Sequence, residues 1–432
     1  MATVISMPPS AQRRAARGAG PVTRARTKPR IALALAGGGP LGAIYEIGAL
    51  CALQEVIDDL DFTKLDHYVG VSAGSFIAAS LANGMSPQDL CKNFIDNELT
   101  NTDAHLNTDR FDPAWLLQPA WNEFARRAFL LPGLLASSFW RALIERKSWV
   151  SALELLGPAL PTGIFSSERA HERMAAMFSQ PGRTNDFRQL RTKLTLVATN
   201  LNSGESAPFG QKGWDDVPIS KAVQASSALP GLFPPVEIGE HYFVDGALKK
   251  TLHASVAMED AMDLVICLNP LVPFDALHAR GAVMQRGLPK EKQAIPRIAD
   301  GGLPSVLSQT FRSLIHSRLE MGMKAYEREY PATDIVLIEP DQRDPEYYLA
   351  NTFSYSQRRT IAEHAYQQTR HLLRARRSSL TAKFEKHGIR INEEALADPK
   401  RQLVMPAPKA TKIGRAVVKL EETLENLERQ YA

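Results

Sequence analysis

The sequence predicts an α/β protein in which a mostly parallel sheet is covered by helices on both faces. Short apolar runs with the length of buried strands alternate along the chain with longer segments of helical periodicity. In addition, each of the first two runs is followed at once by a glycine-containing turn and then by a helical segment. Repeated strand, tight turn and helix is the pattern of an α/β sheet.

The elements can be assigned in chain order. We expect a first strand at residues 30–36, followed by a helix whose apolar residues recur at helical spacing from Leu41 to Ile57. A second strand at 67–71 leads into a helix that stops at Asn83-Gly84. Further strands are expected at residues 194–199, 242–244, 264–268 and 335–338.

The composition is that of a folded protein without a membrane span. The chain has 432 residues, of which 44% are hydrophobic and 23% charged, so it can form one large domain with additions or two domains. A mostly disordered, collagen-like or disulfide-dense protein is excluded. The three scattered cysteines fit a reducing compartment, and there is no apolar run of about 18 residues. We therefore expect a cytoplasmic protein whose membrane contact, if it has one, is peripheral.

Residues 1–29 form a basic arm that precedes the main domain, which we expect at 30–345. The arm holds arginines and a lysine but no acid, and its composition cannot bury enough apolar area to offset chain entropy, so disorder is predicted. A solvated tail, adhesion to anionic lipid or nucleic acid, and a transit-like segment remain open for it.

Within the main domain, residues 85–190 form a long, mainly helical insertion. It carries four of the five tryptophans: Trp115, Trp121, Trp140 and Trp149. These side chains, together with phenylalanines such as Phe129, either pack the core of a helical subdomain or form an acyl-binding roof or interfacial lid.

Beyond the main domain, residues 346–398 are predicted to be a basic helical extension with a solvated basic face. Its clustered arginines are Arg370, Arg374, Arg376 and Arg377. Residues 399–432 form a linker and an amphipathic C-terminal helix. The apolar residues of that helix recur at heptad-like spacing over 413–427, which predicts self-association or docking on the body.

A candidate nucleophile stands between the second strand and its helix. Gly70-Val-Ser-Ala-Gly74 matches the nucleophile elbow G-x-S-x-G in the context that this motif requires. Gly70 and Gly74 permit a turn too tight for side chains, which would expose the Ser72 hydroxyl at the helix N-terminus. The alternative is an ordinary strand-to-helix turn.

The candidate base is an aspartate. A serine hydroxyl needs a base to take its proton, yet no histidine is an obvious candidate at the end of a predicted strand. Asp245 does end a strand, and Gly246 follows it. Turn initiation would explain this pair, but the position is also one where a sheet delivers catalytic groups.

A glycine-rich loop supplies candidate oxyanion donors. Gly37-Gly-Gly-Pro-Leu-Gly42 lies at the start of the first helix, where backbone amides bind anions. The candidate donors are the N–H groups of Gly38, Gly39 and Leu41. Pro40 has no N–H, and Gly37 and Gly42 shape the loop. In other hydrolases such a donor contributes about 3 to 4 kcal/mol.

These motifs, in this order, resemble the patatin-like phospholipase family over residues 30–270. The matching segments are the oxyanion motif Gly37–Gly42, the elbow Gly70–Gly74, the dyad motif Asp245-Gly-Ala, and the connecting stretches 198–205 and 225–235. The resemblance implies a three-layer α/β fold related to cytosolic phospholipase A2. It also implies a Ser72–Asp245 dyad without histidine, an acyl-enzyme intermediate and no metal or cofactor.

On this resemblance we expect a serine hydrolase that cleaves carboxylic esters of phospholipids or related acyl lipids. The expected partners are the lipid substrate and an anionic membrane surface contacted peripherally, with no specific nucleic acid. The chain departs from the family at Leu41, where a basic residue is usual, and at Ala36, where Asp or Ser is common. Both changes retain the backbone amides.

Parts of the sequence are also compatible with two other functions. Gly37, Gly39 and Gly42 also satisfy the dinucleotide-binding pattern G-x-G-x-x-G, but the second strand lacks the acid that would hold a ribose. A lipid-binding or scaffold protein that kept the fold without activity is the other alternative. The presence of both Ser72 and Asp245 speaks against that loss.

Overall fold

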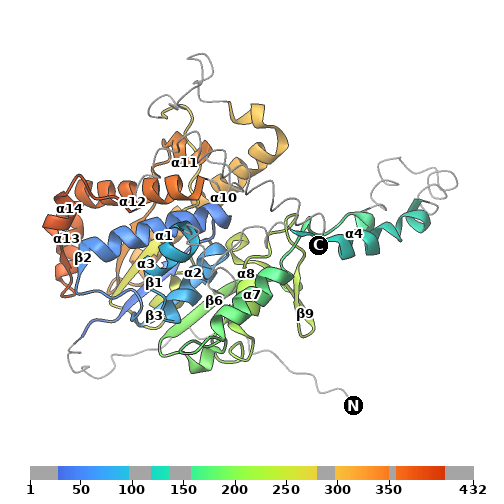
Figure 1. The fold of residues 1–432 in the computed structure, drawn as a ribbon, viewed down its shortest axis with the longest axis horizontal. Coiled ribbons are helices and arrows are strands. Elements are labelled where there is room, and N and C mark those ends of the chain that lie inside the picture. The colour runs from blue at the N-terminus through green and yellow to red at the C-terminus, as the bar shows by residue number, and fades with distance from the viewer. Residues whose placement is uncertain (1–27, 97–117, 136–156, 280–296, 350–356, 404–432) are drawn as a thin grey trace, which may run out of the picture.

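The computed structural model describes residues 28–96, 118–135, 157–279, 297–349 and 357–403. A central sheet with helices on both sides dominates this part of the chain (Figure 1). None of the helices within these ranges is long and apolar enough to span a bilayer.

The main sheet has eight strands in the order β11-β10-β1-β3-β6-β9-β8, with β7 also paired to β6. Its strands are β1 (Ile31–Leu35), β3 (His67–Val71), β6 (Lys193–Asn200), β7 (Ser206–Phe209), β8 (Val236–Ile238), β9 (His241–Asp245), β10 (Leu264–Leu268) and β11 (Asp334–Ile338). All pairs from β11 to β6 are parallel, whereas β7, β8 and β9 pair antiparallel. The predicted α/β fold with a mostly parallel sheet is confirmed.

The helices that lie around this sheet follow the strands in the predicted alternation. The main ones are α1 (Gly39–Val56), α2 (Ala73–Ala82), α4 (Trp121–Ala128), α7 (Glu168–Phe178), α8 (Ile219–Ser226), α10 (Gly302–Glu329), α12 (Arg358–Ala375) and α13 (Arg377–Glu385). Shorter elements are α3 (Pro87–Leu90), α9 (Ser255–Met258), α11 (Pro345–Leu349), α14 (Glu393–Ala397) and the small strands β2 (Ile57–Asp58), β4 (Gln118–Pro119), β5 (Phe165–Ser166) and β12 (Arg390–Ile391).

Strand β1 shows how the sheet separates two apolar layers. Leu33 and Leu35 point into a core shared with α1, α2, α8 and α12. Ala32 and Ala34 point to the other face, where Leu319 of α10 belongs to a second core with residues of α9. Successive side chains of a strand alternate between faces, and both faces of β1 are covered. The arrangement is a three-layer α/β sandwich.

Strands β3 and β9 pair with consecutive stretches of β6 on the same edge. A strand has two hydrogen-bonding edges, and β7 takes one of them along residues 196–199. The other edge pairs with β3 over residues 193–197 and with β9 over residues 198–200. Since β3 runs parallel and β9 antiparallel to β6, their carboxyl ends meet beside residues 197 and 198.

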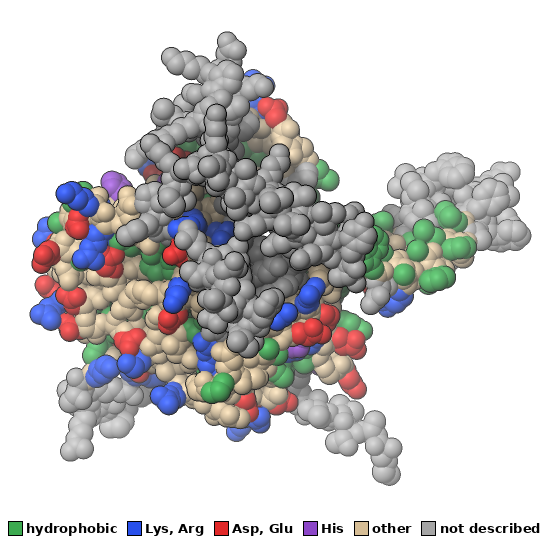
Figure 2. Space-filling model, viewed as in Figure 1, with side chains coloured by type: hydrophobic (Ala, Val, Ile, Leu, Met, Phe, Trp, Pro, Cys, Tyr) green, Lys and Arg blue, Asp and Glu red, His purple; other side chains and the backbone are tan. Residues whose placement is uncertain are grey.

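Part of the tryptophan-rich insertion forms an arm. Helix α4 lies on a projection that reaches away from the sheet (Figure 1), and hydrophobic side chains are exposed along it (Figure 2). Trp121 is 72% and Phe129 85% exposed. For these two residues, the interpretation as a packed helical core is therefore wrong.

Several expectations concern residues outside the described ranges. They are the basic arm before residue 28, the tryptophans Trp115, Trp140 and Trp149, and the amphipathic stretch 413–427.

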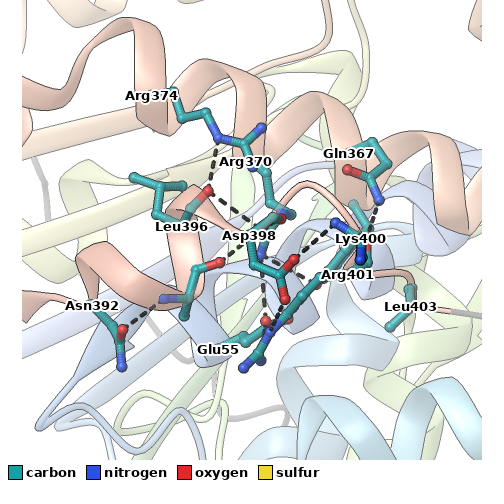
Figure 3. A network of polar contacts seen from close by, with 12 residues as sticks. Glu55, Gln367, Arg370, Arg374, Asn392, Leu396, Asp398, Lys400, Arg401 and Leu403 are labelled. Carbon is teal, nitrogen blue, oxygen red and sulfur yellow. Dashed lines mark hydrogen bonds and ion pairs between the residues drawn. The ribbon is translucent and has the colours of Figure 1, made fainter.

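The C-terminal extension packs against the main domain through α12, which lies along α1 (Figure 1). Arg370 of α12 is fully buried, so the expectation of a solvated basic face is wrong at this position. Its guanidinium donates to the carbonyl oxygens of Ala395 at 2.7 Å and Asp398 at 2.8 Å (Figure 3). It also lies 3.4 Å from a carboxylate oxygen of Glu55 in α1. One buried cation thus fastens the end of α14 to the first helix.

Strand β11 is an outer strand of the sheet, and two cations cover its free edge. Arg376 donates to the carbonyl oxygen of Leu337 at 3.1 Å, and Lys383 donates to that of Ile335 at 2.9 Å. Both cations come from the C-terminal extension.

Candidate active site

The turn after β3 holds Ser72 in a strained conformation. Ser72 is the N-cap of α2, with φ 52° and ψ −126°. A positive φ is costly for a residue other than glycine, on the order of 1–3 kcal/mol, and such strain clusters at functional sites. The hydroxyl of Ser75 donates to the Ser72 carbonyl oxygen and helps to hold the turn. These features agree with the elbow that the motif predicts.

The two elbow glycines are needed for close packing. A Cβ on Gly70 would lie 2.6 Å from the Ser75 Cα, and one on Gly74 would lie 2.5 Å from the Ala36 carbonyl oxygen. Real Cβ atoms do not approach other atoms so closely. Gly74 therefore lets α2 pack directly against the end of β1, from which the glycine-rich loop departs.

The glycine-rich loop lies against the candidate nucleophile. A Cβ on Gly37 would be 2.9 Å from the Ser72 Cβ and 3.5 Å from its Oγ. Gly38 is the N-cap of α1, and Gly39 has φ +60°, a left-handed conformation that favours glycine. The first amides of a helix have no carbonyl partner within the helix. The amides of this loop are thus available next to Ser72.

Leu41 and Gly42 occupy the first turn of α1. The Leu41 side chain is buried in the core, so only its backbone amide can act at the site. A Cβ on Gly42 would lie 3.1 Å from the Pro270 Cγ, so a larger residue here would require the proline ring to shift slightly.

Asp245 ends β9, opposite Ala198 of β6, and the Ser72 side chain lies beside its carboxylate. The backbone N–H of Ala247 also donates to its carboxylate, at 2.9 Å. Gly246 permits this turn, since a Cβ there would lie 2.1 Å from the Val197 carbonyl oxygen. The structure therefore brings the two residues of the predicted dyad together.

The Asp245 carboxyl is almost completely buried. Burial raises its pKa to about 6, and the neighbouring Ser72 hydroxyl and the hydrogen bond from the Ala247 amide oppose part of that rise. A carboxylate with a pKa near neutrality is a stronger proton acceptor than an exposed aspartate, yet it remains ionised at neutral pH. Its electrostatic environment suits a general base.

Sequence reasoning missed how the stretch 225–235 supports both residues. The Ser226 hydroxyl accepts the Ser72 N–H at 2.8 Å and donates to the Val197 carbonyl oxygen at 2.6 Å. Two residues later, the Ala228 carbonyl oxygen accepts the Asp245 N–H at 3.0 Å. The only signal in the sequence was that this stretch resembles the family between its motifs.

His253 was also missed. It is buried, has φ 45°, and its Nε2 lies 3.4 Å from the Gly246 carbonyl oxygen. Burial lowers its pKa to about 3, so the imidazole is neutral at physiological pH. The His253 ring thus contacts the backbone of the turn that follows Asp245, and it can hold that turn in place.

A sequence model described as Patatin-like phospholipase matches residues 33–258, a span that contains the glycine-rich loop, the elbow and Asp245. This chain belongs to the patatin-like phospholipase family. Membership supports lipid hydrolase activity in general terms, on a patatin-like α/β fold.

The two relatives described next match this chain either over a short segment or at low sequence identity. An uncharacterized NTE family protein of Mycobacterium bovis is 47% identical over 51 residues, which are 12% of this chain and 9% of that protein. The chain thus matches less than a tenth of that relative. An uncharacterized protein of Acanthamoeba polyphaga mimivirus is 23% identical over 238 residues, covering 54% of this chain and 63% of the other.

Among solved structures, VipD from Legionella pneumophila aligns with a TM-score of 0.32 and 17% identity, covering 94% of this chain and 76% of VipD. The type III effector ExoU aligns with a TM-score of 0.30 and 15% identity, covering 81% of this chain and 53% of ExoU.

Proposed function

We propose that the protein is a serine lipid acyl hydrolase that cleaves carboxylic ester bonds of phospholipids or related acyl lipids. The observation that carries the proposal is that the Ser72 side chain lies beside the buried Asp245 carboxylate, where β3 and β9 meet on one edge of β6. A serine in a strained elbow, paired with a base of raised pKa, is the arrangement that nucleophilic catalysis requires.

In the first half of the reaction, Asp245 takes the proton of Ser72 while Oγ attacks the ester carbonyl carbon. The carbonyl oxygen becomes an oxyanion, for which the N–H groups of Gly38, Gly39 and Leu41 are the proposed donors. The proximity of Gly37 to Ser72 supports this role for the loop. Protonated Asp245 then gives its proton to the leaving alcohol, and an acyl-enzyme remains on Ser72.

In the second half, Asp245 takes a proton from water, and the hydroxide attacks the acyl carbonyl at the same oxyanion donors. Collapse of this intermediate releases the fatty acid and returns the proton from Asp245 to Ser72 Oγ. Each step uses the same base and donors, so no further titrating group is needed. His253, held neutral against Gly246, supports the turn that carries Asp245.

The test is hydrolysis of a short p-nitrophenyl acyl ester by the full-length protein, with fluorophosphonate labelling read by intact mass. We expect turnover and a single adduct, both lost in Ser72→Ala. Ser80→Ala is the matched control, because Ser80 is a buried serine of the same helix that donates to the Phe76 carbonyl oxygen. A folded wild type without turnover or adduct would instead indicate a lipid-binding scaffold.

A further inference from the structure

The first half of α10 has its polar side facing the protein. Gln309 exchanges hydrogen bonds with the backbone of Phe274, at 3.1 and 2.9 Å. Arg312 is buried and donates to the Val272 carbonyl oxygen at 3.3 Å. One turn later, buried His316 lies 2.9 Å from the amide of Gln342. These polar contacts fix the rotation of the helix about its axis.

The opposite side of the same turns is apolar and exposed. Leu303 is 70%, Phe311 49% and Leu314 57% exposed, and Leu307 and Val306 are exposed beside them. Residues three and four apart share one face of a helix, so Leu303, Leu307, Phe311 and Leu314 form a continuous stripe. We call this stripe the outer face of α10. This part of α10 projects beyond the sheet (Figure 1), and hydrophobic side chains are visible beside it (Figure 2).

Rotating α10 to bury the outer face would strip Arg312 and His316 of their partners. Leaving such buried polar groups unpaired costs about 1–3 kcal/mol each, more for a charged group. The exposure is therefore built into the packing, and contiguous exposed apolar surface of this kind marks an interaction site.

The outer face lies close to the proposed dyad. Arg318 of α10 donates to the carbonyl oxygen of Leu248 at 3.0 Å, and the Thr251 hydroxyl donates to that of Ile315 at 3.3 Å. Leu248 is in the turn that directly follows Asp245. A ligand that docks on α10 would therefore lie next to the segment that holds Asp245, the proposed base.

The charges at this end of the molecule favour an anionic occupant. Residues 302–319 contain no Asp or Glu. In addition, Arg318, Lys249 and Lys250 are exposed beside the turn that follows Asp245. In a dimer formed through this face, these cations would lie near the same cations of the second copy and repel them. An aggregated lipid surface instead offers acyl chains to the apolar stripe and phosphates to the cations.

We propose that the outer face of α10 docks on an anionic lipid surface, from which the dyad draws its substrate. The proposal rests on the proposed function, because it assigns the lipid surface to the same site. Aliphatic and aromatic side chains of the stripe enter the boundary between headgroups and acyl chains, while Arg318 and the two lysines contact anionic headgroups.

The experiment measures co-sedimentation with phosphatidylcholine vesicles that contain phosphatidylglycerol. Every protein carries Ser72→Ala, so the vesicles stay intact and binding is read independently of catalysis. The test variant is Leu307→Gln/Phe311→Gln/Leu314→Gln. Its control, Ser308→Gln/Ser313→Gln/Ser317→Gln, changes three exposed positions of the same helix without removing apolar area.

We expect the test variant to bind at least about tenfold more weakly, since three large apolar side chains no longer enter the lipid. The control variant should bind like its parent, and vesicles without phosphatidylglycerol should bind the parent more weakly. Equal binding by test and control variants overturns the proposal. A missing fluorophosphonate adduct on Ser72 of the wild-type protein, measured separately, would contradict the proposed function instead, so the two failures are distinguishable.

Two further readouts identify other occupants. If light scattering shows that the test variant turns a dimer into a monomer while vesicle binding is unchanged, the outer face joins two copies. If its melting temperature falls well below that of the control, the face is covered by a segment of its own chain, such as 413–427. Either result overturns the proposal, whereas unchanged mass and melting together with weaker vesicle binding support it.

Discussion

Ser72 follows β3 and Asp245 ends β9 on the same edge of β6, so the two residues meet where one strand stops pairing and the other begins. The proposed base is thereby held in the sheet by the pairing of Asp245 with Ala198. This placement also buries Asp245, and its burial has consequences for activity and for stability that can be measured separately.

Ester hydrolysis should rise as pH increases through about 6. The pKa of Asp245 is raised to about 6 by burial, and only the ionised carboxylate can take the Ser72 proton. The measurement is kcat/KM for a soluble ester across this range, with folding followed at each pH. A rate that is flat through about pH 6 in folded protein would contradict Asp245 as the base.

Asp245→Asn should lose activity yet raise the melting temperature at neutral pH. A carboxyl whose pKa is higher in the folded than in the unfolded state stabilises the fold at low pH, and this contribution is lost as pH rises through about 6. Neutral asparagine avoids that loss, which is on the order of 2–3 kcal/mol. The gain should vanish near pH 4.

The control for this effect is Asp186→Asn. Hydrogen bonds from Arg188 lower the pKa of the partly exposed Asp186 to about 2, so its charge is favoured in the folded state. Removing it should not raise the melting temperature. A gain in both variants would mean that general charge removal, rather than burial of Asp245, is responsible.

Ser226→Ala should lower kcat by on the order of tenfold. The change leaves the Ser72 N–H without its partner in a strained turn, and an unsatisfied buried donor costs about 1–3 kcal/mol. The rate of fluorophosphonate labelling should fall in parallel, because the nucleophile itself is displaced. Neighbouring Ser227→Ala should keep both rates. Equal loss in the two variants would point to general damage of α8.

Gly37→Ala should lower turnover by about a hundredfold while the protein stays folded. The added methyl group would lie 2.9 Å from the Ser72 Cβ and 3.3 Å from the Ala247 Cβ, so either the elbow or the loop must move. A misplacement of about 1 Å can cost about a hundredfold in rate. Gly133→Ala, where a Cβ meets nothing within 4 Å, is the control and should be silent.

Arg370→Met should destabilise the fold by about 3–5 kcal/mol, because it leaves buried carbonyl groups and Glu55 without their cation. Arg377→Met removes an exposed ion pair with Glu393 instead, and such pairs contribute at most about 1 kcal/mol. Urea unfolding of both variants measures the difference. Similar midpoints would show that Arg370 does not fasten the extension to α1.

The sequence predicted the strands and the motif turns because both are local. Strand β10 has the expected bounds 264–268, and Ser72 stands at the turn between β3 and α2. Antiparallel β7 and β8 were not foreseen, since both are short and neither is a continuous apolar run: Pro208 lies within β7 and Glu237 within β8. The pairing of β3 and β9 on one edge of β6 is a tertiary property that no spacing along the chain encodes.

Burial was harder to predict than secondary structure. Arg370 lies in a basic run that is otherwise exposed, and the carbonyl groups at the end of α14 together with Glu55 explain its burial. The apolar stripe of α10 gives the opposite case, because periodicity alone would direct it toward the core. The support that Ser226 gives to Ser72 likewise depends on a contact between residues 154 positions apart.

The cations on β11 bear on how the protein behaves in a crowded solution. An outer strand with free carbonyl groups is a template to which another chain can add its own strand. Arg376 and Lys383 already occupy the outward carbonyl groups of Leu337 and Ile335. An incoming strand would have to displace two charged side chains, so this end of the sheet resists edge-to-edge aggregation.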